Sequence, residues 1–232
     1  MAFKWTSTRA LPAYLGVCAA LGGGLAGLPG LAAPSASGTT MNLPLHFAPG
    51  PGGGFVARGL GYGVSIEPGA VTVRLAAKGG PETITERLLG ASATATASAE
   101  RRLPGVHNVL VGNDPSAWRT KLPTYSRVRV QSAYPGVDVI YYGSGRRIQA
   151  DYVVAPGADS KRIRLAFEGV TGASIQPGGE LRLAGRNGSL TKSRPVAYQM
   201  VGARKVPVQA AYRLASAAGG PVAGFEVGAY DR

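Results

Sequence analysis

The sequence is almost devoid of cysteine and histidine. Of its 232 residues only Cys18 is a cysteine, and the two histidines are His46 and His107. Cys18 falls in an apolar segment that we predict to be removed, so the remaining chain has no thiol for a disulfide, a nucleophile or a metal. Two histidines with neither a nucleophile elbow nor H-E-x-x-H spacing do not indicate a serine triad or a zinc site. We therefore predict no metal, no cofactor and no enzyme activity.

Acidic residues are also scarce. The chain has 12 of them against 25 basic residues, which gives a net charge of +13. Such a charge attracts polyanions at low salt. The export signal described next argues against nucleic acid and favours anionic envelope polymers or phospholipid headgroups, if the charge has a role at all. A generally basic, solvated surface is the other interpretation.

The N-terminus has the pattern of a secretory signal peptide. Lys4 and Arg9 precede an apolar segment over residues 11–33, whose end satisfies the small-x-small rule for signal peptidase. We predict cleavage after Ala32, with Ala33 as the second choice, and hence a secreted or cell-surface protein. An uncleaved anchor is the alternative, because the segment has the length of a membrane-spanning helix. After cleavage no membrane span remains.

The dominant signal after the leader is alternation of apolar and polar residues. In residues 162–168 the apolar Ile163, Leu165 and Phe167 alternate with polar positions, and residues 127–131 repeat the pattern. Short runs of this kind, separated by Gly and Pro, predict an antiparallel β-sandwich of roughly 12 strands, with two packed sub-sandwiches as an alternative. The predicted organisation is a signal peptide over residues 1–33, a linker over 34–42 and one all-β domain over 43–232.

Several turns can be predicted from their chemistry. Pro presets the first central position of a type II turn and Gly accepts the positive φ of the second. Such pairs occur at residues 135–136, 156–157 and 177–178. A single helical turn is predicted where Asp114 caps and Pro115 takes the first helical position, ending near Trp118.

Two carboxylates are weak catalytic candidates. A hairpin closed at residues 143–145 would set Asp138 opposite Asp151. Glycoside hydrolysis uses a carboxylate pair, and close carboxylates raise one pKa, as an acid catalyst requires. The ordinary alternative is that each carboxylate pairs with an arginine on a neighbouring strand. The arginines in question are Arg127, Arg129 and Arg147.

Aromatic residues give weak candidates for ligand binding. Trp118, Tyr141 and Tyr142 could stack on sugars, although adjacent strand residues face opposite sides, so at most one of the two tyrosines could join such a platform. Core packing is the alternative. An extracellular calcium site is a further hypothesis, but the predicted capping role of Asp114 explains that residue adequately. The oxygen ligands of such a calcium site would come from Asn113, Asp114 and a loop carboxylate such as Asp159.

The central run GNDPSAWRTKLPTYSRVRVQSAYPGVDVIYYG, residues 112–143, carries a family resemblance. It resembles a domain of unknown function near the N-terminus of bacterial surface proteins with β-propeller-type (SBBP) repeats. Matching stretches on both sides extend the similarity over almost the whole mature chain. Residues 48–54 depart from the family, which has a longer acidic segment there. The chain also stops at Asp231 and Arg232, where relatives continue into another strand and their repeats, so we expect a truncated or free-standing version.

The resemblance implies a secreted or surface module without known activity, and it transfers no site residues. We therefore expect a noncatalytic, exported β-sandwich module with a structural or adhesive role at the bacterial cell surface. Its partner would be an envelope polysaccharide or a surface protein. The alternatives are a carbohydrate-active enzyme and a module that binds polyanions or carbohydrate.

Overall fold

The structure, a computed structural model, describes residues 13–20, 45–59, 61–77, 79–144, 147–201 and 203–230, with the backbone alone for residues 13–20. Within these ranges the chain forms 18 β-strands and no α-helix, which confirms the predicted all-β class. The predicted cleavage sites and the linker over residues 34–42 lie outside the described residues. No described residue belongs to a helix that is long and apolar enough to cross a membrane.

Most of the strands are short, apart from β7 and β8 with 14 and 16 residues, and they follow one another closely along the chain. They are β1 Ala13–Ala20, β2 Phe47–Pro49, β3 Phe55–Gly59, β4 Tyr62–Glu67, β5 Ala70–Leu75, β6 Glu82–Leu88, β7 Thr96–Val109, β8 Arg119–Tyr134, β9 Val137–Ser144, β10 Arg147–Val154, β11 Arg164–Glu168, β12 Gly172–Ile175, β13 Leu181–Ala184, β14 Ser189–Lys192, β15 Val196–Val201, β16 Arg204–Val208, β17 Ala210–Ala217 and β18 Gly220–Val227. Three 3-10 turns, η1 Pro51–Gly53, η2 Pro115–Ala117 and η3 Ser160–Arg162, complete the description.

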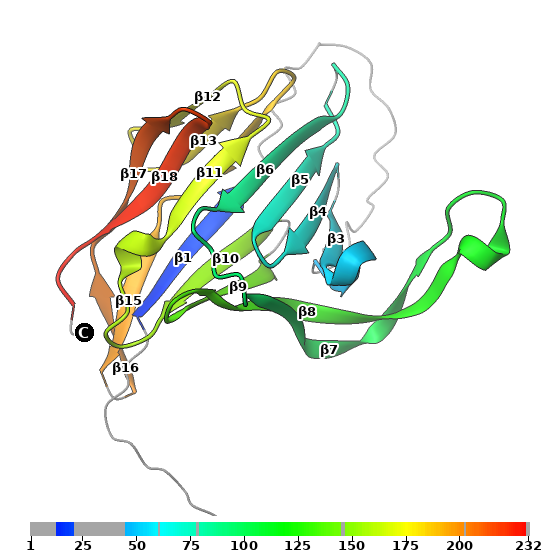
Figure 1. The fold of residues 1–232 in the computed structure, drawn as a ribbon, viewed down its shortest axis with the longest axis horizontal. Helices are drawn as coiled ribbons and strands as arrows, with labels where there is room; N and C mark the ends of the chain where they lie inside the picture. Colours follow the sequence, from blue (N-terminus) through cyan, green and yellow to red (C-terminus); the bar gives the residue numbers. More distant parts are fainter. Residues whose placement is uncertain are drawn as a thin grey trace, which may run out of the picture.

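All the strand pairings are antiparallel, and they build two layers (Figure 1). In one layer the successive neighbours are β17, β18, β11, β6, β5, β4, β3 and β2. In the other they are β7, β8, β9, β10, β1, β15 and β16. The remaining strands β12, β13 and β14 join this second layer where β14 pairs with β1. At one end β2 contacts β8 through Phe47 and Tyr125, which links the layers.

One apolar core lies between the layers. It contains Ile84 and Phe167 from the first layer together with Val139 and Tyr152 from the second, all at most 2% exposed. Buried and more exposed residues alternate along β4, β6 and β10, as the sequence pattern predicts. A hydrogen bond also crosses the core, from the Tyr134 hydroxyl to the Arg164 carbonyl at 2.9 Å. The burial of the two inner faces therefore fixes which side of each strand faces the solvent.

Two of the three predicted Pro-Gly turns are confirmed. Gly136 and Gly157 have positive φ values of 71° and 77°. At the third turn the predicted type II geometry is wrong, because the positive φ of 88° belongs to Gly179 and not to Gly178. The Gly179 N–H donates to the Gln176 carbonyl at 2.8 Å, so Pro177 and Gly178 hold the central positions as predicted, and the left-handed residue follows them. This order, a turn followed by a left-handed glycine, is a common hairpin connection.

Candidate interaction site

The longest hairpin of the fold, β7–β8, projects from the sandwich (Figure 1). Its outer part, residues 103–123, is called the arm here. Close to the sandwich, β8 pairs with β9 from Arg127 to Tyr134, whereas toward the tip it pairs with β7. The arm thus carries two strands away from the core and exposes both of their faces.

Bulges bend the arm along its length. The β7–β8 register shifts between Leu103 and Val106 and again between His107 and Val109. Lys121, opposite the second shift, has a left-handed φ of 56°, and its N–H donates to Asn108 Oδ1 at 2.8 Å. Because a bulge adds a residue to one strand, it increases the local twist and redirects the hairpin.

The tip of the arm is the predicted capped turn. Asp114 Oδ1 accepts hydrogen bonds from the Ser116 N–H at 2.9 Å and from its hydroxyl at 2.8 Å. These two bonds lower the pKa of the Asp114 carboxyl. The Trp118 indole N–H donates to the Gly112 carbonyl at 3.2 Å and closes the other side of the turn. The prediction of a turn from Asp114 to Trp118 is confirmed, in 3-10 rather than α form.

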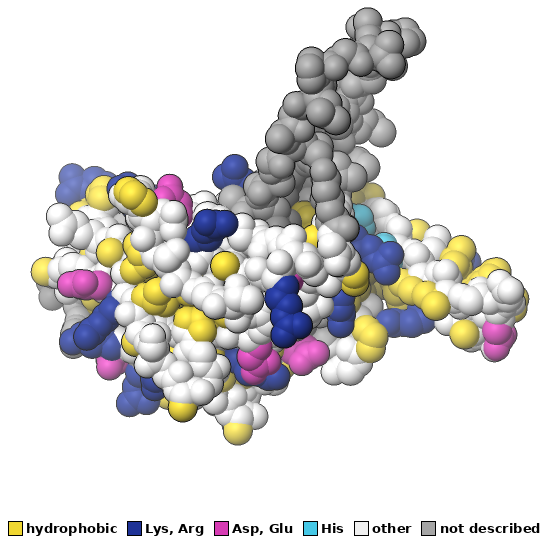
Figure 2. Space-filling model, turned by 90° about the horizontal axis from the view of Figure 1, so that it is seen from above, with side chains coloured by type: hydrophobic (Ala, Val, Ile, Leu, Met, Phe, Trp, Pro, Cys, Tyr) yellow, Lys and Arg dark blue, Asp and Glu magenta, His cyan; other side chains and the backbone are white. Residues whose placement is uncertain are grey.

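Large apolar side chains gather on the arm and are exposed. Val106, Leu110, Val111 and Trp118 are 56%, 57%, 66% and 37% exposed. Hydrophobic atoms run along the arm in Figure 2, and Lys and Arg side chains surround its base. Because exposed apolar side chains that gather in one place are unusual on a monomer, the arm has the composition of a contact surface.

A groove of about 870 Å³ opens between the arm and strands β3 and β4. We call it the arm groove. Its lining includes Arg58, Arg74, Arg119 and Val111, with Glu67 as the acidic residue among them. Arg119 also donates from Nη2 to the Pro49 carbonyl at 3.2 Å, which holds the arm against the β2 end of the sandwich. The arm therefore contributes apolar residues such as Val111 together with Arg119, and the sandwich contributes Arg58 and Arg74.

The two histidines meet at the base of the arm. The rings of His46 and His107 have centroids 5.7 Å apart, and His107 lines the arm groove. Burial lowers the pKa of His107, and the neighbouring His46 and Arg58 lower it further. These surroundings therefore favour the neutral imidazole of His107 over the charged form. Neither the arm groove nor this ring contact follows from the sequence pattern, because each joins residues that are distant in the chain.

The model of a family of domains of unknown function, DUF7948, matches residues 54–232. The chain belongs to this family. The matched residues include the arm, most of the arm groove and both carboxylates predicted from the sequence. The comparison with curated proteins finds no match. The comparison with solved structures finds none either.

The two carboxylates of this DUF7948 domain do not lie directly opposite each other, so the predicted register is wrong. Asp138 is the partner of Val153, and Asp151 is the partner of Ile140. Ser144 pairs with Arg147, so the connection lies at residues 145–146 rather than at 143–145. This moves the pairing by two positions and leaves both carboxylates on the same outer face as diagonal neighbours.

Each carboxylate already has a partner. Asp138 forms an ion pair with Arg129, Nη1 to Oδ2 at 3.1 Å, and accepts the Ser132 N–H at 2.8 Å. This confirms the arginine alternative for Asp138. Asp151 accepts the Tyr142 hydroxyl at 3.1 Å. Burial raises the pKa of Asp151, although the Tyr142 hydrogen bond and the charge of Arg127 oppose the shift.

The aromatic candidates do not form one platform. Tyr141 is 3% exposed and faces the core, while Tyr142 faces outward beneath the Arg127 guanidinium, 5.4 Å from the ring centroid. The prediction that at most one of these tyrosines could face a ligand is confirmed. Trp118 lies at the arm tip, and at about 3.3 Å per strand residue it is roughly 25–30 Å from Arg127, the register partner of Tyr142.

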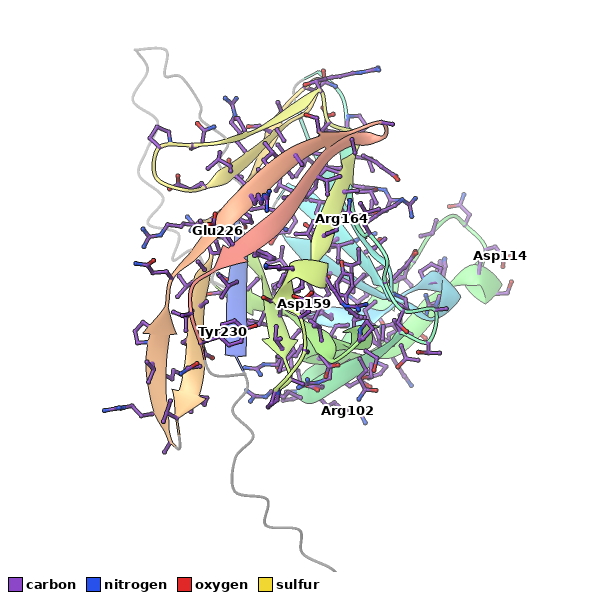
Figure 3. All side chains as sticks on the ribbon, turned by 60° about the vertical axis from the view of Figure 1, so that its left-hand side comes forward. Arg102, Asp114, Asp159, Arg164, Glu226 and Tyr230 are labelled. Carbon is purple, nitrogen blue, oxygen red and sulfur yellow. The ribbon has the colours of Figure 1, made fainter. Side chains whose placement is uncertain are left out.

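Asp114 and Asp159, two of the ligands suggested for a calcium site, lie far apart. Figure 3 shows Asp114 at the end of the arm and Asp159 in the sandwich. Asp159 caps its own 3-10 turn by accepting the Lys161 N–H at 3.0 Å. Over the described ranges, no group of three or more His, Cys, Asp or Glu residues could hold a metal ion.

Proposed function

We propose that this DUF7948 domain is a noncatalytic, exported β-sandwich module with a structural or adhesive role at the bacterial cell surface. In this proposal it binds another polypeptide through the arm and the arm groove. The signal-peptide pattern of residues 11–33 supports export. The resemblance of residues 112–143 supports a place in surface proteins that carry β-propeller-type (SBBP) repeats.

The observation that carries the proposal is the exposure of Val106, Leu110, Val111 and Trp118 on a projecting hairpin. Residues of this kind supply the desolvated centre of a protein interface, whereas polar residues form its rim. Val106 lies in β7, and the Trp118 side chain is fixed by its hydrogen bond to the Gly112 carbonyl beside the capped 3-10 turn, which reduces the ordering cost of binding. The exposed apolar side chains of the arm therefore need little rearrangement when a partner binds.

The charge around the arm groove indicates the chemistry of the partner. The groove is lined by Arg58, Arg74 and Arg119, and Glu67 is the one acidic residue among the described residues of its lining. A partner segment that combines apolar side chains with carboxylates would complement both the arm and these guanidinium groups. We therefore propose an acidic, partly apolar polypeptide segment as the ligand and not a neutral polysaccharide.

The test places a photo-crosslinking amino acid at position 110 in cells that export the protein. Position 175 is the matched control, because Ile175 is an exposed apolar residue, 42%, on β12 away from the arm. Crosslinks from 110 to an acidic surface polypeptide, with none from 175, are expected. The double variant Leu110→Ser and Val111→Ser should reduce retention at the cell surface, and Ile175→Ser should not.

Two results would contradict the proposal. One is retention of the arm variant equal to that of the control while position 110 crosslinks to no polypeptide. The other is a hydrolase activity that disappears in Asp138→Asn and Asp151→Asn, which would favour the carbohydrate-active alternative. Thermal unfolding of the arm variant distinguishes lost binding from lost folding. Substitutions of exposed residues change the free energy of unfolding by about 0.5 kcal/mol or less, so the variant should unfold at nearly the same temperature as the unmodified protein.

A further inference from the structure

Strand β1 fills a gap in the second layer of the sandwich. It pairs with β10 over seven positions, from Ala13 opposite Val154 to Ala19 opposite Ile148. On its other side it pairs with β15 over four positions and with β14 over two. Figure 1 shows β1 between β10 and β15. We call the gap that it occupies the strand slot.

The strand slot is bounded by two strand edges that meet only through β1 in the described pairings. The other neighbour of β10 is β9, and the other neighbour of β15 is β16. Without a strand in the slot, the eight-residue β10 would present a row of unpaired N–H and C=O groups. Such groups require a partner, and a row of them accepts an extended peptide.

The register gives the slot an inner and an outer side. Positions 15, 17 and 19 lie opposite Tyr152, Ala150 and Ile148, which are at most 8% exposed. Position 15 also lies opposite Ala197 of β15, which is 4% exposed. Leu, Val and Ala stand at these three inner positions, so the sequence of β1 has apolar residues wherever the sheet neighbours are buried.

The strand that occupies the slot belongs to the predicted signal peptide. Ala13–Ala20 lies within residues 11–33, and cleavage after Ala32 would separate it from the rest of the sheet. We infer that the strand slot is a binding site for an extended polypeptide segment of small and apolar residues, and that Ala13–Ala20 is its occupant in the full-length chain. This inference does not depend on the arm.

The register itself supplies the test, because Cys18 is the one cysteine of the chain and its partner position on β10 is Gln149. Partner residues across antiparallel strands have Cα atoms about 4.5–5.5 Å apart, within the range for a disulfide. Full-length protein from cell-free synthesis, with Gln149→Cys, should form the 18–149 disulfide upon oxidation. The matched variant Asp151→Cys, which moves the thiol two positions to the partner of Gly16, should not.

A positive control keeps the experiment decisive. Tyr142 and Gln149 are register partners on β9 and β10, so Tyr142→Cys with Gln149→Cys and Cys18→Ser should form a disulfide whether or not the slot is filled. If this control links and the 18–149 pair does not, the inference is wrong. A disulfide from Cys18 to position 151 in preference to 149 would equally contradict it.

Binding of the segment as a separate peptide can be measured with the same protein. A protease site inserted in the linker over residues 34–42 allows the leader to be cut after folding. The released segment should stay bound during gel filtration and should exchange with a labelled peptide of residues 11–22. Val17→Asp should weaken the binding of that peptide by at least about tenfold, since it sets a charge at the register partner of buried Ala150. Cys18→Asp, at the register partner of Gln149, should weaken the binding less. Equal binding of the two peptides would overturn the proposed inner and outer sides.

Discussion

Lys192 of β14 and Glu86 of β6 form an ion pair inside the core, across the two layers of the sandwich. Their side chains are 6% and 10% exposed. The Tyr152 hydroxyl donates to the other carboxylate oxygen, Glu86 Oε1, at 3.3 Å. A carboxylate can be buried without a large loss of stability only when a counter-charge lies beside it and hydrogen-bond donors satisfy its lone pairs. The pair therefore couples the folding of the two layers.

Removal of one member of this pair should destabilise the domain strongly. Lys192→Met leaves the Glu86 carboxylate buried without its counter-charge, and the expected loss is about 3–5 kcal/mol in the free energy of unfolding. Equilibrium unfolding in urea measures it. Lys192→Met combined with Glu86→Leu should recover much of the loss, because no isolated charge remains.

The surface pair between Arg87 and Glu168 is the matched comparison. Its side chains are 54% and 49% exposed, so solvent screens the attraction, and Arg87→Ala should cost far less stability than Lys192→Met. Equal losses for Lys192→Met and Arg87→Ala would show that the buried pair is not what holds the layers together.

Tyr141 and Tyr134 should respond in opposite ways to replacement by Phe. The Tyr141 hydroxyl is buried and has no hydrogen-bond partner in the described part of the chain, and burial raises its pKa well above the usual value. Tyr141→Phe removes that unpaired group and should stabilise the domain by about 1 kcal/mol. Tyr134→Phe removes the hydrogen bonds with the Arg164 carbonyl and N–H and should destabilise it by about 1 kcal/mol or more. Thermal and urea unfolding decide between these signs, and two variants of the same sign would refute this account.

The left-handed backbone of Lys121 predicts an unusual tolerance of glycine in the arm. Lys121 has a φ of 56°, whereas its neighbour Thr120 is not among the residues with positive φ. An L-residue in this conformation costs about 1–2 kcal/mol relative to glycine. Lys121→Gly should therefore be more stable than Thr120→Gly by about that amount in urea unfolding. Thr120→Gly that is as stable as Lys121→Gly would rule out strain at this bulge.

The sequence predicts strands well where one face is buried, and it predicts relationships between distant strands poorly. The alternating run at residues 127–131 lies within β8, and the run at 162–168 overlaps β11. Alternation determines which face of these strands points inward, because only that register buries the apolar side chains in the core. The carboxylate register failed because two connecting residues decide it, and residue spacing alone does not distinguish residues 143–145 from 145–146.

The candidate sites show the same difference between local features, which the sequence indicates, and contacts between distant residues, which it does not. The exposed residues Val106, Leu110 and Val111 appear in the sequence only as apolar residues without strict alternation, a pattern that does not distinguish an exposed surface from an ordinary strand. Its projection depends on bulges, which leave no composition signal. The Glu86–Lys192 pair joins residues 106 positions apart, so no local pattern could indicate it.

Acidification should act on the base of the arm through His107. Its pKa lies below the usual 6.5, first because of burial and then because of the nearby His46 and Arg58. The folded state thus binds a proton at this position less readily than the unfolded state does. The stability that His107 contributes is fully present above pH 6.5 and is lost as the pH falls through the folded pKa.

NMR titration of the His107 ring measures this directly and should give a pKa below 6.5. Arg58→Ala should move that pKa upward, because the variant removes one of the positive charges that oppose protonation. In unfolding experiments His107→Gln should lose less stability than the unmodified protein between pH 7 and pH 5, since glutamine does not acquire a charge. A His107 pKa at or above 6.5 would contradict the prediction. So would an Arg58→Ala variant with an unchanged pKa, because the arginine would then lie too far from the ring to affect it.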